Sequence, residues 1–324
     1  MIVQSDTNAE RNACEVPTLL WIKEGTGSCS LSPGLDFPAG GLQWQRWVAR
    51  YDRMQARYLV QREERFSLLV RMVRELGGPS ARVVELGCGP GSLMAATLEA
   101  MPGAEVWGID FDLAALLLAR ARLACYGERA HLALADLRSP AWREGLPGEV
   151  DAVLSATALH WLKPAALAAL YRQIAVLLRR GGLFLNADHV GSGCPALQGA
   201  WERHREEMRA AQGDLARAGG DRALECAAFQ CAASEPVDDW DGFWAAYTAA
   251  LGLEAADEGA RVLGGWDGGV EQGLPLAWHL DALRAAGFET VDCFWRCDCD
   301  AIYGGIKSLE KPATQTRSCG KERV

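Results

Sequence analysis

The stretch VVELGCGPGSL, residues 83–93, joins a short apolar run to a segment with the composition of a helix. Gly87, Gly89 and Gly91 occupy every second position, and without a Cβ atom the backbone can turn sharply there and approach a ligand. A strand, a glycine-rich loop and a helix in this order are typical of nucleotide-binding α/β folds. We therefore expect a nucleotide-like ligand at this loop.

The loop departs from the dinucleotide-binding pattern at two positions. Ser92 stands where the third glycine of GxGxxG would allow close packing around a pyrophosphate. Glu85 adds a carboxylate beneath the loop, which is unfavourable beside a pyrophosphate but suits a cationic ligand. Both departures disfavour an NAD-dependent oxidoreductase, which stays an alternative here.

Short apolar runs alternate with helical segments over residues 81–190. This alternation predicts a doubly wound, mostly parallel sheet with helices on both faces. Ligands of such sheets bind beyond the carboxyl ends of the strands, so every strand-end residue is a site candidate. The predicted strands are 82–86, 104–110, 130–136, 150–156 and 182–189, and the predicted helices are 92–101, 112–126 and 164–179.

The segments before the core differ in their hydrophobic pattern. Residues 1–40 show no sustained periodicity, and we expect them to be disordered. Residues 41–80 carry apolar side chains mostly three and four positions apart, which predicts one or two amphipathic N-terminal helices.

The segments after the core are an insertion, a return to the core and a tail. Residues 191–276 hold 15 acidic and 6 basic side chains, and we interpret them as an acidic helical insertion that forms a lid. Residues 277–307 predict a helix that ends at Gly287, followed by strands at 288–296 and 299–306 whose short connection permits an antiparallel pair. Residues 308–324 are expected to be a flexible tail.

The segment from Glu85 to Gly91 fits the pattern E/D-x-G-x-G-x-G, and there the chain resembles the class I S-adenosylmethionine-dependent methyltransferases. The resemblance covers about 81–190 and 277–307. It implies a seven-stranded sheet in the order 3-2-1-4-5-7-6 with strand 7 antiparallel, and S-adenosyl-L-methionine as cofactor. The cofactor-binding residues it implies are Glu85, Gly87, Cys88, Gly89, Gly91, Asp110, Phe111, Asp136, Leu137 and Ser155.

The resemblance also gives roles to the ends of the second and third strands. Asp110 matches the carboxylate that accepts hydrogen bonds from both ribose hydroxyls, and Phe111 matches an apolar contact of the adenine. Asp136 matches the acceptor of the adenine amino group, with Leu137 as a wall or backbone contact. We interpret Asp112 as the N-cap of the following helix rather than as a ligand contact.

The stretch SATALHWLKP, residues 155–164, follows the fourth predicted strand and places His160 beside Trp161. Small-molecule methyltransferases of this class often carry a similar A-L-H-W step, which implies an acceptor pocket at this point. An imidazole is suited to act as a general base at neutral pH. His160 is therefore our candidate catalytic residue, with substrate orientation and a purely structural role as alternatives, and Trp161 is interpreted as a pocket wall.

The insertion contains an aromatic helix face formed by Trp240, Phe243, Trp244 and Tyr247, at positions i, i+3, i+4 and i+7. This face either docks the helix on the core or lines an acceptor lid, and we favour docking. Trp240, Trp244 and Trp161 are nevertheless candidates for substrate binding, together with Tyr51 from the N-terminal helices.

Composition restricts the partners. The net charge of −9 disfavours a nucleic-acid surface, which normally needs a basic face, and no segment has the length and apolar content of a membrane span. Eleven cysteines without CxxC pairs favour a cytoplasmic protein. We expect a monomer or homodimer that methylates a small-molecule acceptor at oxygen, nitrogen or carbon. A catalytically inactive S-adenosylmethionine-binding module is the alternative.

Overall fold

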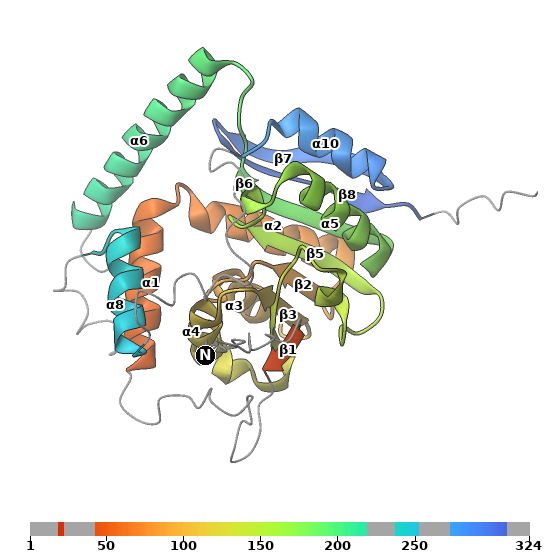
Figure 1. The fold of residues 1–324 in the computed structure, drawn as a ribbon, viewed down its shortest axis with the longest axis horizontal. Coiled ribbons are helices and arrows are strands. Elements are labelled where there is room, and N and C mark those ends of the chain that lie inside the picture. Colours follow the sequence, from red (N-terminus) through yellow and green to blue (C-terminus); the bar gives the residue numbers. More distant parts are fainter. Residues whose placement is uncertain (1–18, 23–42, 219–236, 253–272, 310–324) are drawn as a thin grey trace, which may run out of the picture.

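An eight-stranded mixed sheet forms the centre of the computed structural model, which describes residues 19–22, 43–218, 237–252 and 273–309 (Figure 1). The strand order is β1-β4-β3-β2-β5-β6-β8-β7. Strands β2 to β6 are parallel to one another, and β8 is antiparallel to both β6 and β7. The strands are β1 (Leu19–Ile22), β2 (Arg82–Leu86), β3 (Glu105–Asp110), β4 (Ala130–Ala135), β5 (Val150–Ala156), β6 (Leu178–His189), β7 (Phe288–Cys297) and β8 (Asp300–Lys307).

The sheet confirms the predicted topology. Without β1, its order reads 3-2-1-4-5-7-6 in the numbering of the core strands, with the last strand of the chain antiparallel. The sheet also has a strand that the sequence did not predict, because Leu19–Ile22 pairs antiparallel with β4 and extends the edge. Four residues are too few for a periodic pattern to appear in a segment of mixed composition. Residues 1–18 and 23–40, the rest of the segment expected to be disordered, lie outside the described residues.

Alternating side chains of the strands build two cores, one on each face of the sheet. On one face, Val83 and Val106 pack with residues of α2 (Arg62–Gly77), α3 (Ser92–Ala100) and α4 (Leu113–Leu123). On the other face, Val84 and Phe184 pack with residues of α5 (Pro164–Leu177) and α10 (Leu276–Ala285). Burial on both faces explains why these strands are nearly continuous apolar runs.

A third cluster joins the N-terminal helices to the insertion. Helix α1 (Trp44–Tyr58) packs against α4 and α8 (Trp240–Ala250), and Phe243 and Tyr247 of α8 are fully buried there. Tyr247 donates a hydrogen bond to the carbonyl oxygen of Ala114 in α4 at 3.2 Å. The preferred interpretation of the aromatic face, that it docks α8 on the rest of the chain, is therefore confirmed for Phe243 and Tyr247.

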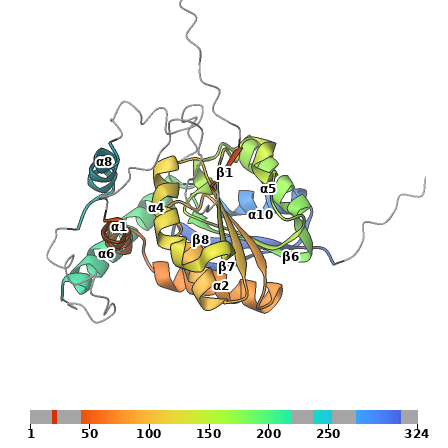
Figure 2. The same cartoon turned by 90° about the horizontal axis from the view of Figure 1, so that it is seen from below.

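The insertion lies to one side of the sheet. Figure 2 shows α1, α8 and α6 (Pro195–Ala218) grouped on the same side of the molecule. Arg209 of α6 donates to the carbonyl oxygen of Tyr58 at 2.9 Å, so α6 contacts the end of α1. Residues 219–236 and 253–272 of the insertion, and residues 310–324 of the tail, lie outside the described residues.

Within the described parts of the chain, no helix combines the length and the apolar character that crossing a membrane requires.

Candidate active site

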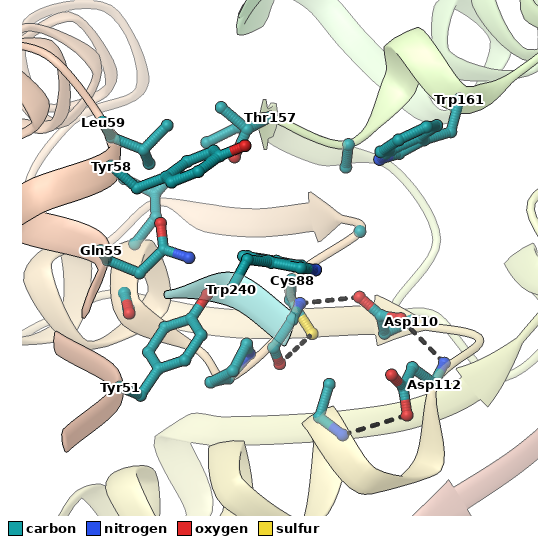
Figure 3. Close-up of a pocket in the computed structure, with 18 of the residues that line it drawn as sticks. Tyr51, Gln55, Tyr58, Leu59, Cys88, Asp110, Asp112, Thr157, Trp161 and Trp240 are labelled. Atoms are coloured by element: carbon teal, nitrogen blue, oxygen red, sulfur yellow. Dashed lines mark hydrogen bonds between the residues drawn. The ribbon is translucent and has the colours of Figure 1, made fainter. Parts of the chain in front are cut away.

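A pocket of about 490 Å³ lies beyond the carboxyl ends of β2, β3, β5 and β6, as expected for this topology (Figure 3). The glycine loop and the ends of the strands form one side, and α1, α2 and α8 close it from the other. Of the predicted site residues, eleven line this pocket: Tyr51, Glu85, Gly87, Cys88, Gly89, Asp110, Phe111, His160, Trp161, Trp240 and Trp244.

The three glycines of the loop share a positive φ angle and differ in what surrounds them. All three have positive φ angles, of 65° at Gly87, 49° at Gly89 and 74° at Gly91. A Cβ atom on Gly87 would lie 2.3 Å from the Cβ of Ala158, so this glycine lets the turn after β5 approach the loop. A Cβ on Gly89 would meet no atom within 4 Å. Gly91 is the N-cap of α3 and packs against α4, which explains why it does not line the pocket.

Glu85 presents a buried carboxylate to the pocket. Its Oε2 atom has no hydrogen-bond partner among the described residues. Burial, together with the nearby charge of Asp110, raises the pKa of Glu85 well above its usual range. A buried polar atom without a partner is costly, and a cationic or hydrogen-bond-donating ligand group would satisfy it. The residue therefore fits a positively charged ligand.

Asp110 holds the glycine loop to the end of β3. Its Oδ2 accepts from the backbone N–H of Gly89 at 2.7 Å, and its Oδ1 accepts from that of Asp112 at 2.9 Å (Figure 3). Each oxygen retains a second lone pair for a ligand hydroxyl. Burial raises the pKa of Asp110 to about 6 despite these two N–H donors.

Asp112 caps the next helix, as predicted. Its Oδ1 accepts from the backbone N–H groups of Ala114 at 2.8 Å and Ala115 at 3.2 Å. This cap fixes the start of α4 and orients the turn that carries Asp110 and Phe111.

His160 lies in the short helix η3 (Leu159–Trp161) and is fixed by a buried carboxylate. Its Nδ1 lies 2.6 Å from Oδ1 of Asp188, and its backbone N–H donates to Oδ2 of Asp188 at 2.9 Å. Burial alone would raise the pKa of Asp188. The charges and hydrogen bonds of His160 and His189 outweigh burial and hold that pKa well below its usual range.

The ionised Asp188 sets the hydrogen bonding of the His160 ring. An acceptor-only carboxylate requires a proton on Nδ1, so in the neutral ring Nε2 is the acceptor. Asn186 donates to Oδ2 of Asp188 at 3.3 Å and to the hydroxyl of Tyr303 at 2.8 Å, which anchors the carboxylate from behind. The arrangement presents a base to the pocket.

Aromatic side chains form the remaining walls. Figure 3 shows Tyr51 and Tyr58 across the pocket from Trp161, with Trp240 between them. Trp161 packs on His160 with ring centroids 4.5 Å apart. The indole Nε1 of Trp244 is buried and has no hydrogen-bond partner among the described residues, so the wall also offers a donor.

Four predicted cofactor residues do not line the pocket. Gly91 packs against α4, as above. The carboxylate of Asp136 is paired with Arg138, whose Nε lies 2.8 Å from Oδ2. Leu137 packs against the core on the face of the sheet that α5 and α10 cover. Ser155 is fully buried and donates to the carbonyl oxygen of Leu86 at 2.7 Å. The ligand contacts assigned to these residues stay predictions.

The sequence interpretation missed several residues of the site. Asp188 and His189 end β6, and Asp300 begins the antiparallel β8 directly opposite His189. Their position at a strand end was a usable signal for Asp188 and His189. No sequence spacing connects Asp300 to them, because their proximity depends on the register of two strands that are distant in the chain. Ser92, which replaces a glycine, also lines the pocket.

The comparisons with known proteins concern mainly the core. Residues 83–182 match a family model described as a methyltransferase domain. A release factor glutamine methyltransferase of Gloeobacter violaceus is 39% identical over 97 residues, which are 29% of this chain and 32% of that protein. A trans-aconitate 2-methyltransferase of Streptomyces avermitilis is 32% identical over 108 residues, 33% of this chain and 39% of that protein. The matched parts thus make up 32% and 39% of the two relatives, well under two thirds of the length of either.

Two solved structures have a similar chain path. A putative O-methyltransferase of Nostoc punctiforme is 17% identical, with 81% of this chain and 60% of that chain covered and a TM-score of 0.46. The magnesium protoporphyrin IX methyltransferase of Synechocystis, with bound SAH, is 15% identical, with 82% and 94% covered and a TM-score of 0.44. These values are too low to assign an acceptor.

The strand order, the glycine loop and the family match agree. Residues 83–182 match a methyltransferase domain, and the strand order of the sheet is the one that the resemblance of the glycine loop implied. The remaining strands β7 and β8 complete the sheet of this domain.

Proposed function

We propose that this protein transfers a methyl group from S-adenosylmethionine to a hydroxyl oxygen of a small-molecule acceptor. The observation that carries this proposal is a single pocket that joins two carboxylates beside a glycine loop to a His–Asp pair. Glu85 and Asp110 lie at the loop, and His160 lies at the end of β5.

The residues present fit the cofactor. The unpartnered Oε2 of Glu85 suits a cationic ligand, and both oxygens of Asp110 retain a lone pair for the two hydroxyls of a ribose. Bound there, S-adenosylmethionine supplies a methyl group on a positively charged sulfur, whose C–S bond breaks as the acceptor oxygen bonds to the methyl carbon. Phe111 and Trp161 add apolar walls to the same pocket.

The presence of His160 is our reason for proposing a hydroxyl oxygen as the methyl acceptor. A carboxylate acceptor is already anionic and needs no base, whereas a hydroxyl must lose its proton as the new bond forms. In the neutral ring, Nε2 of His160 takes that proton, and the buried carboxylate of Asp188 stabilises the imidazolium through Nδ1–H. Orientation and dehydration of the acceptor supply the rest of the rate enhancement for an in-line displacement.

Calorimetry with S-adenosylmethionine and with S-adenosylhomocysteine tests the cofactor assignment. We expect both to bind with one-to-one stoichiometry and NAD not to bind. If neither sulfur compound binds to the full-length chain, the proposed function is wrong. Binding of both without turnover of any phenol, alcohol or hydroxy acid in a screened set would favour an inactive binding module.

A further inference from the structure

A second imidazole lines the same pocket as His160. His189 is the last residue of β6, and its Nδ1 lies 2.7 Å from Oδ1 of Asp300. The two residues are register partners in the antiparallel pair of β6 and β8. The side chain of Asp300 is 7% exposed and that of His189 is 11% exposed, so the pair is largely shielded from water.

Asp300 also has a positively charged neighbour, which lies near the same carboxylate oxygen as His189. The guanidinium of Arg65, a buried residue of α2, lies 3.7 Å from Oδ1 of Asp300 and donates to the carbonyl oxygen of Ala187 at 3.0 Å. Burial would raise the pKa of Asp300, but the hydrogen bond from His189 and the charge of Arg65 lower it. The ionised carboxylate accepts from Nδ1–H of His189, so Nε2 of the neutral ring is an acceptor.

The two histidines are therefore matched and adjacent. Their ring centroids lie 4.9 Å apart with an interplanar angle of 59°, and each Nδ1 is taken by a separate buried carboxylate. Among the described residues, neither Nε2 forms a hydrogen bond. Two imidazoles that line one pocket, each with Nδ1 bound to a carboxylate, suit a ligand with two neighbouring donors. The proton transfer to His160 in the proposed function uses only one of the two imidazoles.

The walls beside these nitrogens favour a flat acceptor. Tyr58, Phe66, Trp161 and Trp240 line the pocket together with the two histidines. Tyr58 and Trp240 contact each other with ring centroids 6.1 Å apart, and Trp161 lies across the pocket from Tyr58 (Figure 3). Aromatic rings pack well with other rings in offset or edge-to-face geometry.

We propose that His189 is a second acceptor-binding residue and that the acceptor is an aromatic ring with two adjacent hydroxyl groups, a catechol. One hydroxyl gives its proton to Nε2 of His160, and its oxygen bonds to the methyl carbon while the C–S electron pair stays on sulfur. The other hydroxyl donates a hydrogen bond to Nε2 of His189 and keeps its proton. The proposal rests on the proposed function, because it places the acceptor beside the same cofactor.

Three small probes test this proposal with the protein saturated by S-adenosylhomocysteine: catechol, 2-methoxyphenol and phenol. The last two lack the second donor. We expect catechol to bind about tenfold more tightly than 2-methoxyphenol, as loss of one hydrogen bond to a shielded acceptor predicts. His189→Phe keeps a ring of similar size without its nitrogens and should remove this preference while leaving the affinity for S-adenosylhomocysteine within twofold.

The control is His131→Phe, because His131 also pairs with a carboxylate, that of Glu105 at 2.7 Å, but does not line the pocket. It should keep the preference for catechol. Equal binding of catechol and 2-methoxyphenol by the wild-type chain, or no binding of catechol at millimolar concentration, would overturn the inference while the proposed function stands. A preference for catechol that survives in His189→Phe would also overturn the inference. So would a preference that disappears when EDTA is added, because a metal ion would then hold the two hydroxyl groups. Failure of S-adenosylhomocysteine itself to bind would overturn the proposed function.

Discussion

Asp110 connects the protonation of one buried carboxyl group to cofactor affinity. Its folded-state pKa is about 6, raised by burial, and in the proposed function the ionised form accepts hydrogen bonds from the two ribose hydroxyls. As the pH falls from 7 to 5, the ionised fraction falls about tenfold. The affinity for S-adenosylhomocysteine should fall by about the same factor, which calorimetry at several pH values measures.

Asp110→Asn is the control for this pH dependence. The amide does not titrate, so the variant should bind weakly at pH 7 and lose little further affinity at pH 5. Glu85 also has a raised pKa, and Glu85→Gln measures its separate part of the pH dependence. An unchanged wild-type affinity between pH 7 and 5 would contradict the role given to Asp110.

His160 should act on turnover rather than on cofactor binding. Removing a general base lowers turnover by about 10²–10⁴-fold, so His160→Ala should lose that much kcat for a hydroxyl acceptor and keep its affinity for S-adenosylhomocysteine within twofold. Asp188→Asn should lower kcat as well, because an amide does not stabilise the imidazolium as a carboxylate does. The exposed His204, paired with Asp298, offers a matched control, and His204→Ala should leave kcat unchanged. A large loss of cofactor affinity in His160→Ala would contradict its placement.

For single residues, the sequence predicted the position of those whose surroundings come from nearby in the chain. Asp110, Asp112 and His160 each follow a strand or begin a helix, so their positions depend on a few neighbouring residues. The ligand contacts expected of Asp136 and Ser155 stay predictions, because a strand-end position alone does not fix what a side chain contacts. The same strand-end position leaves the first carboxylate paired with Arg138 and the second side chain buried against β2. The first partner lies two residues further along the chain and the second is a backbone carbonyl oxygen of the neighbouring strand, and neither follows from the strand-end position.

Among the elements, the β2–α3 loop depends most on close backbone packing. An alanine at position 87 would have a positive φ of 65° and a Cβ 2.3 Å from that of Ala158. Gly148→Ala is the matched control, because Gly148 has a φ of 50° but open space around a Cβ. Both variants carry the backbone cost of about 1–2 kcal/mol, and Gly87→Ala adds overpacking of about 1–3 kcal/mol.

Chemical denaturation of the two glycine variants measures the difference. We expect Gly87→Ala to be the less stable by at least 1 kcal/mol and to bind S-adenosylhomocysteine more weakly. Equal stabilities would show that the turn after β5 does not approach the loop as closely as the contact between Gly87 and Ala158 requires.

Helix α8 should open without unfolding the sheet. Phe243 is fully buried and packs against Trp47, Tyr51 and Tyr247, and truncating such a ring costs about 3–5 kcal/mol. Phe243→Ala should therefore speed amide hydrogen exchange across residues 240–250 and leave β2 to β5 protected. Val176→Ala, at an exposed position of α5, should change neither. Exchange that accelerates throughout the sheet would instead show that α8 and the core open together.

The helices and strands were the features that the sequence predicted best, and the reason is physical. Strands buried on both faces and amphipathic helices leave strong periodic patterns, which is why α1, α2 and α8 and all seven core strands were found. Strand β1 left none, because it adds only Leu19–Ile22 to the edge and its pairing with β4 is made by backbone groups.

The pocket unites segments from across the whole molecule, so ligand binding should stabilise all of them. Its walls come from α1, α2, the glycine loop, the ends of β3, β5 and β6, and α8. A ligand that binds only the folded chain at 100 times its Kd raises the free energy of unfolding by about 2.7 kcal/mol. At that excess, S-adenosylhomocysteine should raise Tm by several degrees. NAD at the same concentration should not, because the loop presents Glu85 and Ser92 in place of a pyrophosphate site. Asp110→Asn at the same ligand concentration should show a smaller rise than the wild type. A rise in Tm with NAD and none with S-adenosylhomocysteine would instead indicate a dinucleotide-binding protein.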